Sequence, residues 1–348
     1  MISQTDTVAA RVLEYLTPAT VSGAFGVFEW FLRDIYGAGM DSLSELTGVD
    51  MLGYPYMQHA YLAAVLIAVI GPLVGTFLVH REMSMISDTL AHTAFAGVAV
   101  GLFVNTTFSL SISPILTALV AAVVTALLVE VLIEHAGEYT DSSLAMVLTG
   151  GFAVGSILIT ANDGGISVGI DAYLFGNLST VSKENVGVLA GMTAVVGTLV
   201  VIAYRPLLYI TFDATAARAS GIGVRWYKRL MVVLTAVVVV GAMQIMGVIL
   251  VAGMVVIPVS AASLVASSFR RSVVLAVIAG ELAAVTGVTV AYVYDVAAGG
   301  SIVVAAIAVY ASIFFLRGAA RNRSTVYFGV LGDRRKDVEE VSADGGKK

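Results

Sequence analysis

Two ionisable residues, Asp88 and His92, stand four positions apart in the apolar stretch SDTLAHTAFAG, residues 87–97. This spacing places both side chains on one face of a helix. A carboxylate and an imidazole supply one oxygen and one nitrogen ligand, a pair that suits Zn²⁺ or Mn²⁺. The alternative is a local hydrogen-bonded pair that serves helix packing alone. Ionisable groups in such apolar helices are rare and usually functional, so the pattern favours a metal site.

Other ionisable residues of the apolar segments give weaker signals. Glu281 lies in the middle of VLAVIAGELAAVTGV, where it can line a cation path or sit protonated inside a helical bundle. Glu130 lies about one turn from a helix end, and we expect it to be solvated or to extend its side chain toward the interface. His59, His80 and His135 fall at the ends of apolar runs, and none has metal-site spacing with another histidine.

Two short patterns resemble those of hydrolytic enzymes. GISVG, residues 165–169, matches G-x-S-x-G, but it stands in a glycine-rich loop rather than a strand-to-helix turn. The dipeptide Tyr294–Asp295 matches half of an intramembrane aspartyl protease site, and the second Gly-Asp motif is missing. A phosphate-binding P-loop and an H-E-x-x-H motif are also absent from the sequence. We therefore expect a chain that is not an enzyme and does not hydrolyse ATP itself.

Composition restricts the class of protein. The 348 residues are 58% hydrophobic and 12% charged, with a mean hydropathy of +0.94. These values predict an integral protein of the lipid membrane, folded as one polytopic helical bundle. The absence of cysteine excludes disulfides, thiolate zinc sites and iron–sulfur clusters. Basic residues are scattered in short loops and the net charge is −5, which argues against a nucleic-acid partner.

Apolar runs of spanning length predict nine transmembrane helices, so the expected fold is all-α with about eight or nine spans. The run 230–267 is too long for one span, and we divide it between Gln244 and Gly247, where a polar and a flexible residue allow a turn. The predicted spans are Ala60–Val79, Ser87–Val104, Pro114–Ile133, Ser143–Ala161, Asn185–Tyr204, Leu230–Gln244, Gly247–Ser267, Ser272–Tyr294 and Ser301–Leu316.

Charge predicts the orientation of these spans and three regions of the chain. All lysines and arginines except Arg11, Arg33 and Lys183 fall in one alternating set of loops or in the carboxyl-terminal tail, which are therefore cytoplasmic. Before the spans, FGVFEWFLRDIYG gathers aromatic rings on one face and predicts an interfacial helix that ends at Gly37. The predicted regions are an extension (1–56), a permease domain (57–318) and a cytoplasmic disordered tail (319–348).

The basic loop YRPLLYITFDATAARASGIGVRWYKR predicts a short helix between two spans. Asp213 can cap its amino end, alanines follow, and Gly221 ends it. An ordered loop of this length is unusual for a simple connection, so we expect an exposed docking element for a soluble partner.

Glycines at four-residue spacing predict close helix packing at Gly97 with Gly101 and at Gly151 with Gly155.

Five segments follow one another along residues 57–318. They are GPLVGTFLVHREMSMISDTLAHTAFAGVAVG, DAYLFGNLSTVS, FDATAARASGIGV, MGVILVAGMVVIPVSAA and YDVAAGGSIV. In this order they resemble the permease subunit of zinc- and manganese-type ABC importers, which are related to cobalamin and siderophore permeases. The fourth segment is similar to that family's Gly-to-Pro helix, here from Gly247 to Pro258, which we expect to pack within the bundle. Two positions depart from the family pattern: Glu82 replaces a second basic residue and Asn177 an acid.

The resemblance implies a bundle like that of type II ABC importers in the cytoplasmic membrane, and a homodimer. Its implied partners are a cytoplasmic ATPase subunit and an extracytoplasmic metal-binding protein. It further implies that Asp88 and His92 coordinate the transported Zn²⁺ or Mn²⁺, which is cargo rather than a permanently bound cofactor. The residues that match the ATPase-docking helix are Asp213, Ala214, Ala216, Ala217, Arg218 and Gly221.

Three other functions remain open from the sequence. A permease for a metal chelate would have a wide apolar pathway and no ligand role for Asp88 and His92. A secondary cation transporter could use the intramembrane acids, although the docking-type loop disfavours it. An intramembrane protease would need a paired acid or a serine–histidine arrangement, and neither is found.

Overall fold

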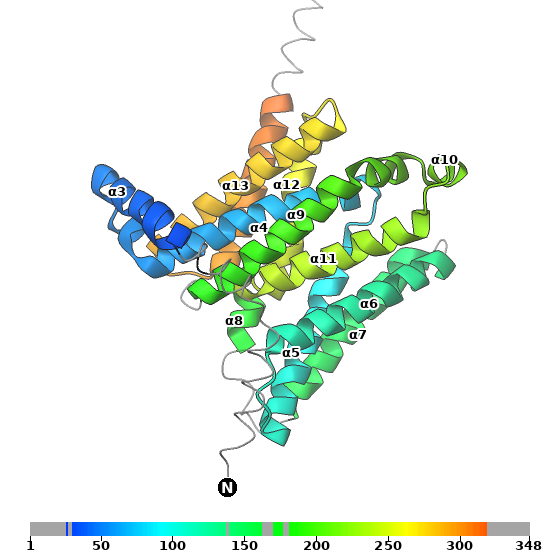
Figure 1. The fold of residues 1–348 in the computed structure, drawn as a ribbon, viewed down its shortest axis with the longest axis horizontal. Coiled ribbons are helices and arrows are strands. Elements are labelled where there is room, and N and C mark those ends of the chain that lie inside the picture. The colour runs from blue at the N-terminus through cyan, green and yellow to red at the C-terminus, as the bar shows by residue number, and fades with distance from the viewer. Residues whose placement is uncertain (1–25, 27–29, 137–138, 162–169, 177–180, 319–348) are drawn as a thin grey trace, which may run out of the picture.

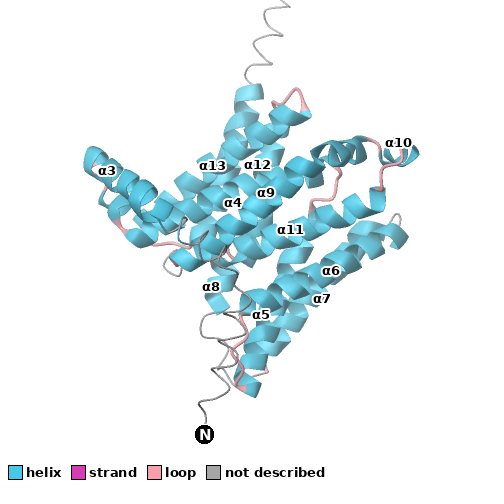
Figure 2. Ribbon diagram, viewed as in Figure 1, coloured by secondary structure: helices cyan, strands magenta, loops and turns pink. Residues whose placement is uncertain are grey.

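The computed structural model describes residue 26 and residues 30–136, 139–161, 170–176 and 181–318. Throughout these ranges every regular element is a helix and none is a strand (Figure 2). Eight helices in the described part of the chain are long and apolar enough to cross a membrane. The predicted all-α, multi-pass bundle is therefore confirmed. The predicted tail, 319–348, lies outside the described residues.

The long helices follow the predicted apolar runs closely. They are α4 (Pro55–His80), α5 (Met85–Phe108), α6 (Pro114–Ala136), α7 (Thr140–Thr160), α9 (Lys183–Phe212), α11 (Val224–Met246), α13 (Phe269–Tyr294) and a last helix, Ala298–Gly318. Shorter helices are the π-helix η1 (Phe31–Gly37), α3 (Ala38–Thr47), the 3₁₀-helix η2 (Asp50–Gly53), α8 (Ile170–Phe175), α10 (Ala214–Ala219) and α12 (Val248–Ser263).

The break between α11 and α12 falls at Gly247, as the sequence predicts. Gly247 adopts φ +79° and ψ 152°, and a methyl group there would lie 2.6 Å from the backbone nitrogen of Gly176, just after α8. The prediction of a full ninth span over Gly247–Ser267 is wrong, because α12 has only 16 residues. At 1.5 Å per residue it is about 24 Å long, less than the hydrocarbon thickness of a bilayer. It stops early because Ser268 already caps α13, accepting from the backbone N–H of Arg271.

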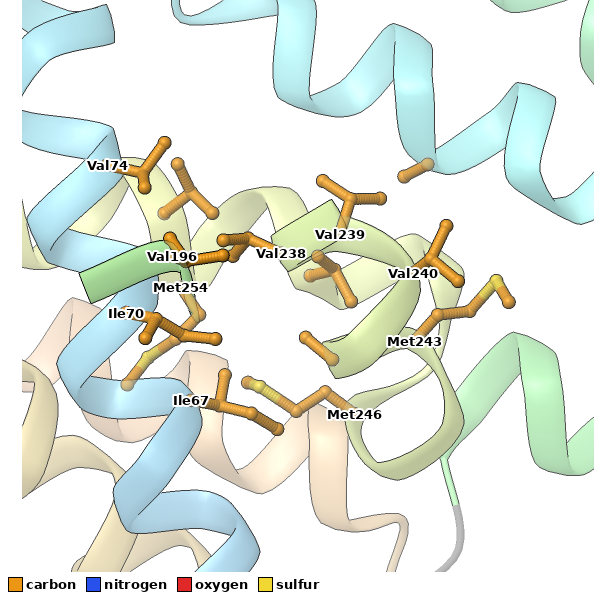
Figure 3. Close-up of a cluster of buried hydrophobic side chains, with 14 of the residues drawn as sticks. Ile67, Ile70, Val74, Val196, Val238, Val239, Val240, Met243, Met246 and Met254 are labelled. Carbon is orange, nitrogen blue, oxygen red and sulfur yellow. The ribbon is translucent and has the colours of Figure 1, made fainter. Parts of the chain in front are cut away.

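The core lies where α4, α9, α11 and α12 meet. Figure 3 shows its side chains: Ile67, Ile70 and Val74 from α4, Val196 from α9, Val238, Val239, Val240, Met243 and Met246 from α11, and Met254 from α12. Helices α5, α6 and α7 form a neighbouring group, in which α5 packs on both of the others and also contacts α11 and α12 (Figure 1). The helix that carries Asp88 and His92 therefore stands between this group and the core.

The sequence predicted that the helix of the extension ends at Gly37, but the helix continues past this residue. Gly37 has helical φ and ψ, and the chain continues through α3 until Gly48, whose φ of +68° ends it. Gly37 is buried, and a methyl group there would lie 3.1 Å from the carbonyl oxygen of Leu32 and 3.4 Å from Oε1 of Gln58. Gln58 in turn donates to Asp41 over 2.8 Å. The glycine permits close packing against α4 rather than a helix end.

The two ends of the bundle differ in their number of basic residues. Arg81, Arg218, Arg225 and Lys228 line one cavity beside α10, whereas at the other end Lys183 lines a pocket beside the extension, whose helix η1 carries Arg33. Helices α3 and α10 lie at opposite ends of the long axis of the molecule (Figure 1). By the positive-inside rule, the α10 end faces the cytoplasm and the α3 end faces outward.

Candidate metal site and coupling elements

Asp88 and His92 lie on the first two turns of α5, near its cytoplasmic end. Their side chains are 40% and 17% exposed, and Nδ1 of His92 lies 3.4 Å from Oδ1 of Asp88. The same nitrogen lies 3.0 Å from the backbone carbonyl oxygen of Asp88. The four-residue spacing thus places the carboxylate and the imidazole on one face of α5 with Nδ1 as the ring nitrogen nearer to Asp88, and both side chains remain partly accessible.

The hydrogen bond to the carbonyl fixes which nitrogen of the His92 ring is available. A carbonyl oxygen only accepts, so Nδ1 must carry the proton in this bond. In a neutral imidazole the other nitrogen, Nε2, then keeps its lone pair. A histidine that donates through one nitrogen to a carbonyl and offers the other is the usual arrangement at metal sites.

Helix α7 forms one wall beside this pair. The ring of Phe152 meets the ring of His92 edge-on, with 5.6 Å between the centroids, and stacks on Phe95 at 5.5 Å. Gly151 and Gly155 of α7 allow this approach: a methyl group on Gly151 would lie 2.6 Å from Cγ2 of Thr93, and one on Gly155 would lie 2.8 Å from Cδ1 of Phe95. These two glycines face α5 at close range.

Helix α6 packs on α5 through the other glycine pair. A methyl group on Gly97 would lie 2.7 Å from Cα of Ala118, and one on Gly101 would lie 3.2 Å from Cα of Pro114. At Gly97 the close atoms include the backbone of Ala118, which cannot move without shifting α6, whereas at Gly101 the nearest atom is the side-chain oxygen of Thr117. Close helix contact, rather than lipid exposure, accounts for these glycines.

The third acid of interest, Glu281, is not a partner of the Asp88–His92 pair. It lies on α13, which packs mainly on α4 and α12. Its Oε1 atom is buried and has no hydrogen-bond partner among the described residues. Within the described ranges, no group of three or more histidine, cysteine, aspartate or glutamate residues could hold a metal ion. In the described part of the chain, Asp88 and His92 thus have no third histidine, cysteine or acidic side chain beside them that could complete a metal site.

The short helix α10 forms where the basic loop predicts it. Oδ1 of Asp213 accepts from the backbone N–H groups of Thr215 and Ala216, at 2.9 and 2.8 Å, and Gly221 turns the chain with φ +81°. The expectation that the whole segment is exposed is wrong for Ala217, which is buried against Ile210 and Val224. Among the other residues of α10, Ala214 is half-buried, whereas Thr215, Ala216, Arg218 and Ala219 face solvent.

Sequence reasoning missed two ion pairs between α6 and α11. Nε of Arg229 donates to Oε2 of Glu130 over 2.8 Å, and Nε of Arg225 lies 3.6 Å from Oε1 of Glu134. Glu130 is not solvated as predicted, because its side chain is only 8% exposed. The matching spacing was visible in the sequence, since the two acids stand four residues apart and so do the two arginines. Recognising the pairs also requires knowing that α6 packs beside α11, which the sequence does not show.

A cavity of about 630 Å³ opens beside these pairs at the cytoplasmic end. It is bounded by the α4–α5 turn, α6, α7, α9, α10 and α11. Arg81 lines it, and burial lowers the pKa of its guanidinium from the usual value. The charged side chains around the cavity are Arg81, Glu82, Glu130, Glu134, Asp141, Arg218, Arg225 and Lys228.

Comparisons with known proteins agree with this architecture. Residues 53–317 match the family model described as the ABC 3 transport family. The chain is 33% identical over 270 residues to the "Manganese transport system membrane protein MntC" of Halalkalibacterium halodurans, covering 76% of this chain and 89% of the relative. It is 29% identical to the "Manganese import system permease protein ScaB" of Streptococcus gordonii, covering 76% of this chain and 92% of the relative.

Solved structures show the same fold. The structure of PsaBC from Streptococcus pneumoniae in complex with Fab is similar with a TM-score of 0.68 and 28% identity, covering 78% of this chain and 95% of that one. An inward-facing putative metal-chelate type ABC transporter shares the fold alone, with a TM-score of 0.59 and 16% identity over 74% and 84% of the two chains. With eight helices in its described part that are long and apolar enough to cross a membrane, and a match to the family model over residues 53–317, this chain belongs to the ABC 3 transport family of membrane permeases.

Proposed function

We propose that the chain is the membrane permease of an ATP-driven importer whose cargo is a divalent transition metal ion, with Mn²⁺ or Zn²⁺ as the candidates. The names of the relatives favour manganese. The observation that carries the proposal is the Asp88–His92 pair, which offers a carboxylate and an available Nε2 on one face of α5.

The pair suits a site of passage rather than a site of storage. A carboxylate oxygen and one imidazole nitrogen replace part of the ion's hydration shell, and water completes it. A closed four-ligand cage would hold the ion too tightly for release, whereas two ligands exchange readily. Phe152 limits water on one side of His92 and holds the ring in place.

The energy comes from a separate ATPase in this proposal. The solvent-facing residues of α10 form the docking surface for that subunit, and movement there rocks the bundle between outward and inward states. The further proposed partners are a second copy of the permease and an extracytoplasmic protein that delivers the ion. Family membership and the position of α10 at the cytoplasmic end support this assignment.

A permease for a metal chelate is the alternative. The similarity to a metal-chelate type transporter is at the level of the fold, at 16% identity. A chelate carries its own ligands, so it would leave Asp88 and His92 without a coordination role. The partly exposed ligand pair favours the free ion.

The test uses the permease purified with its ATPase, reconstituted in liposomes and supplied with the extracytoplasmic metal-binding protein. Asp88→Asn and His92→Ala should each abolish uptake of ⁵⁴Mn²⁺ and weaken Mn²⁺ binding seen by electron paramagnetic resonance. The double variant should be little worse than either single, because the two residues act as one unit. The matched control is His135→Ala, since His135 makes the same bond to a carbonyl, that of Val131, at 2.8 Å but is exposed at the end of α6.

Uptake is expressed per folded transporter, which separates chemistry from stability. A structural pair would lower the melting temperature and leave uptake per folded molecule unchanged. Near wild-type specific uptake in His92→Ala would overturn the metal-site proposal.

A further inference from the structure

The ion pairs between α6 and α11 form a ladder of two steps at the cytoplasmic end of the bundle. Glu130 and Glu134 come from the last two turns of α6, and Arg229 and Arg225 from the first two turns of α11. Glu130 with Arg229 is the strong step: it is short, at 2.8 Å, and its carboxylate is buried. The step of Glu134 with Arg225 is 3.6 Å long and exposed, so solvent screens it.

One side of this ladder is joined directly to α10. Val224 begins α11, and it packs with Ala217 of α10 and Ile210 of α9 in a small apolar cluster. Arg225 follows at the next position. The first turns of α11 and the docking helix therefore form one packed unit, so a displacement of α10 reaches Arg225 and Arg229.

The other side of the ladder is joined to the candidate metal helix. Along its length α6 packs on α5, and the closest approach is that of Gly97 to the backbone of Ala118. A shift of α6 therefore moves α5 as well, because the two backbones touch at Gly97 with no flexible side chain of the glycine between them. Asp88 and His92 lie on this helix. The ladder thus completes a continuous physical route from the docking surface to the ligand pair.

We propose that Glu130 and Arg229 are positioning residues for transport, which transmit movement of the α10–α11 unit to α6 and, through it, to the Asp88–His92 pair. This inference rests on the proposed function. The neighbouring cavity of about 630 Å³ gives the helix ends room to move. The pair joins a half-exposed guanidinium to a buried carboxylate, and its short bond is a directional contact that holds only in a narrow geometry, whereas an apolar contact tolerates sliding.

Removing only one partner is a poor test, because it leaves a buried uncompensated charge and destabilises the fold. The informative variant replaces both: Glu130→Leu with Arg229→Met. Replacing both members of an ion pair that buries a carboxylate by apolar residues of similar volume usually preserves the stability of the protein, so this variant should fold. In the reconstituted complex we expect near wild-type ATP hydrolysis and about ten-fold less Mn²⁺ uptake per ATP hydrolysed, a typical size for coupling between sites.

The matched control is Glu134→Gln with Arg225→Gln, which removes the exposed step and should lower uptake per ATP far less. Arg229→Lys keeps the charge but loses the planar guanidinium, and it should retain intermediate uptake per ATP. If the apolar double variant does not fold, this single variant carries the test. Mn²⁺ binding by electron paramagnetic resonance should stay unchanged in every ladder variant.

Three outcomes would overturn the inference. They are wild-type uptake per ATP in the folded double variant, wild-type uptake per ATP in Arg229→Lys, and an equal loss in the Glu134–Arg225 control. Failure of the proposed function looks different: the wild-type complex itself would then neither bind nor import Mn²⁺ or Zn²⁺. A melting temperature measured for each variant separates loss of coupling from loss of the fold.

Discussion

The ring of Phe152 on α7 meets the imidazole of His92 on α5 edge-on, with 5.6 Å between the two centroids. This contact, together with the bond from Nδ1 to the carbonyl of Asp88, holds the imidazole from two sides. The ring orientation is thus determined by a neighbouring helix as well as by its own. A ligand held before the ion arrives loses less entropy on binding.

Phe152→Ala should therefore weaken Mn²⁺ binding while leaving both ligands in place. We expect a loss of several-fold, about 1 kcal/mol, the scale of an aromatic pair. Titration of the purified permease followed by electron paramagnetic resonance measures it. Phe108→Ala is the control, since Phe108 lies exposed at the end of α5 far from His92. Equal affinity in wild type and Phe152→Ala would show that the contact does not position the ligand.

Replacing either of two neighbouring alanines of α10 by glutamate should have different effects: at Ala216 on ATPase binding, and at Ala217 on folding. Ala216 faces solvent, so Ala216→Glu should fold normally and reduce ATPase binding. Ala217 is fully buried, so Ala217→Glu places a carboxylate in an apolar cluster and should reduce folded protein. Co-purification of the ATPase and the yield of monodisperse permease measure the two effects. Full ATPase binding by a folded Ala216→Glu variant would contradict the docking role.

Close approach at Gly97 predicts a local stability effect. Gly97→Ala forces a methyl group against the backbone of Ala118 and should destabilise the permease by about 1–3 kcal/mol, the usual cost of overpacking. Gly150→Ala is the control, because no atom lies within 4 Å of a methyl group there. Thermal unfolding in detergent compares the two. A higher melting temperature for Gly97→Ala than for Gly150→Ala would contradict the packing of α5 on α6.

Features set by local spacing could be predicted from the sequence. The shared face of Asp88 and His92 needs only the pitch of a helix, and the break at Gly247 needs only a residue that tolerates positive φ. The cap at Asp213 is equally local, because its partners lie two and three residues ahead. Each of these follows from backbone geometry within one or two turns.

Features set by distant contacts could not be predicted in this way. The hydrogen-bond partner of Glu130, Arg229, is 99 positions away along the chain, so the sequence near Glu130 shows only a helix end. Gly37 continues a helix instead of ending it because Gln58 of α4 packs against it. The burial of Ala217 depends on two other helices. In each case tertiary packing decides between states that the local sequence allows equally.

The extension before α4 gives the last prediction. We propose that residues 30–49 lie in the lipid–water interface on the outward-facing side of the membrane, because this end of the molecule exposes several apolar side chains. They are Trp30, Phe31, Ile35, Leu43 and Leu46. Helix α3 itself buries no residue, so protein contacts do not explain this surface.

Tryptophan fluorescence can test this placement, because the chain has two tryptophans and Trp226→Phe leaves Trp30 as the only one. Brominated lipids in the vesicles should quench Trp30, since an interfacial indole lies near the acyl chains. Leu46→Asp places a charge at the most exposed of these positions, 86% accessible, and should lower that quenching while raising quenching by aqueous iodide. Glu45→Gln changes the charge by the same amount on the other side of α3, roughly 100° around the helix from Leu46 and roughly 160° from Leu43, and should leave both signals unchanged. Efficient iodide quenching of Trp30 in the otherwise wild-type extension, without quenching by brominated lipid, would show that the segment stands in water.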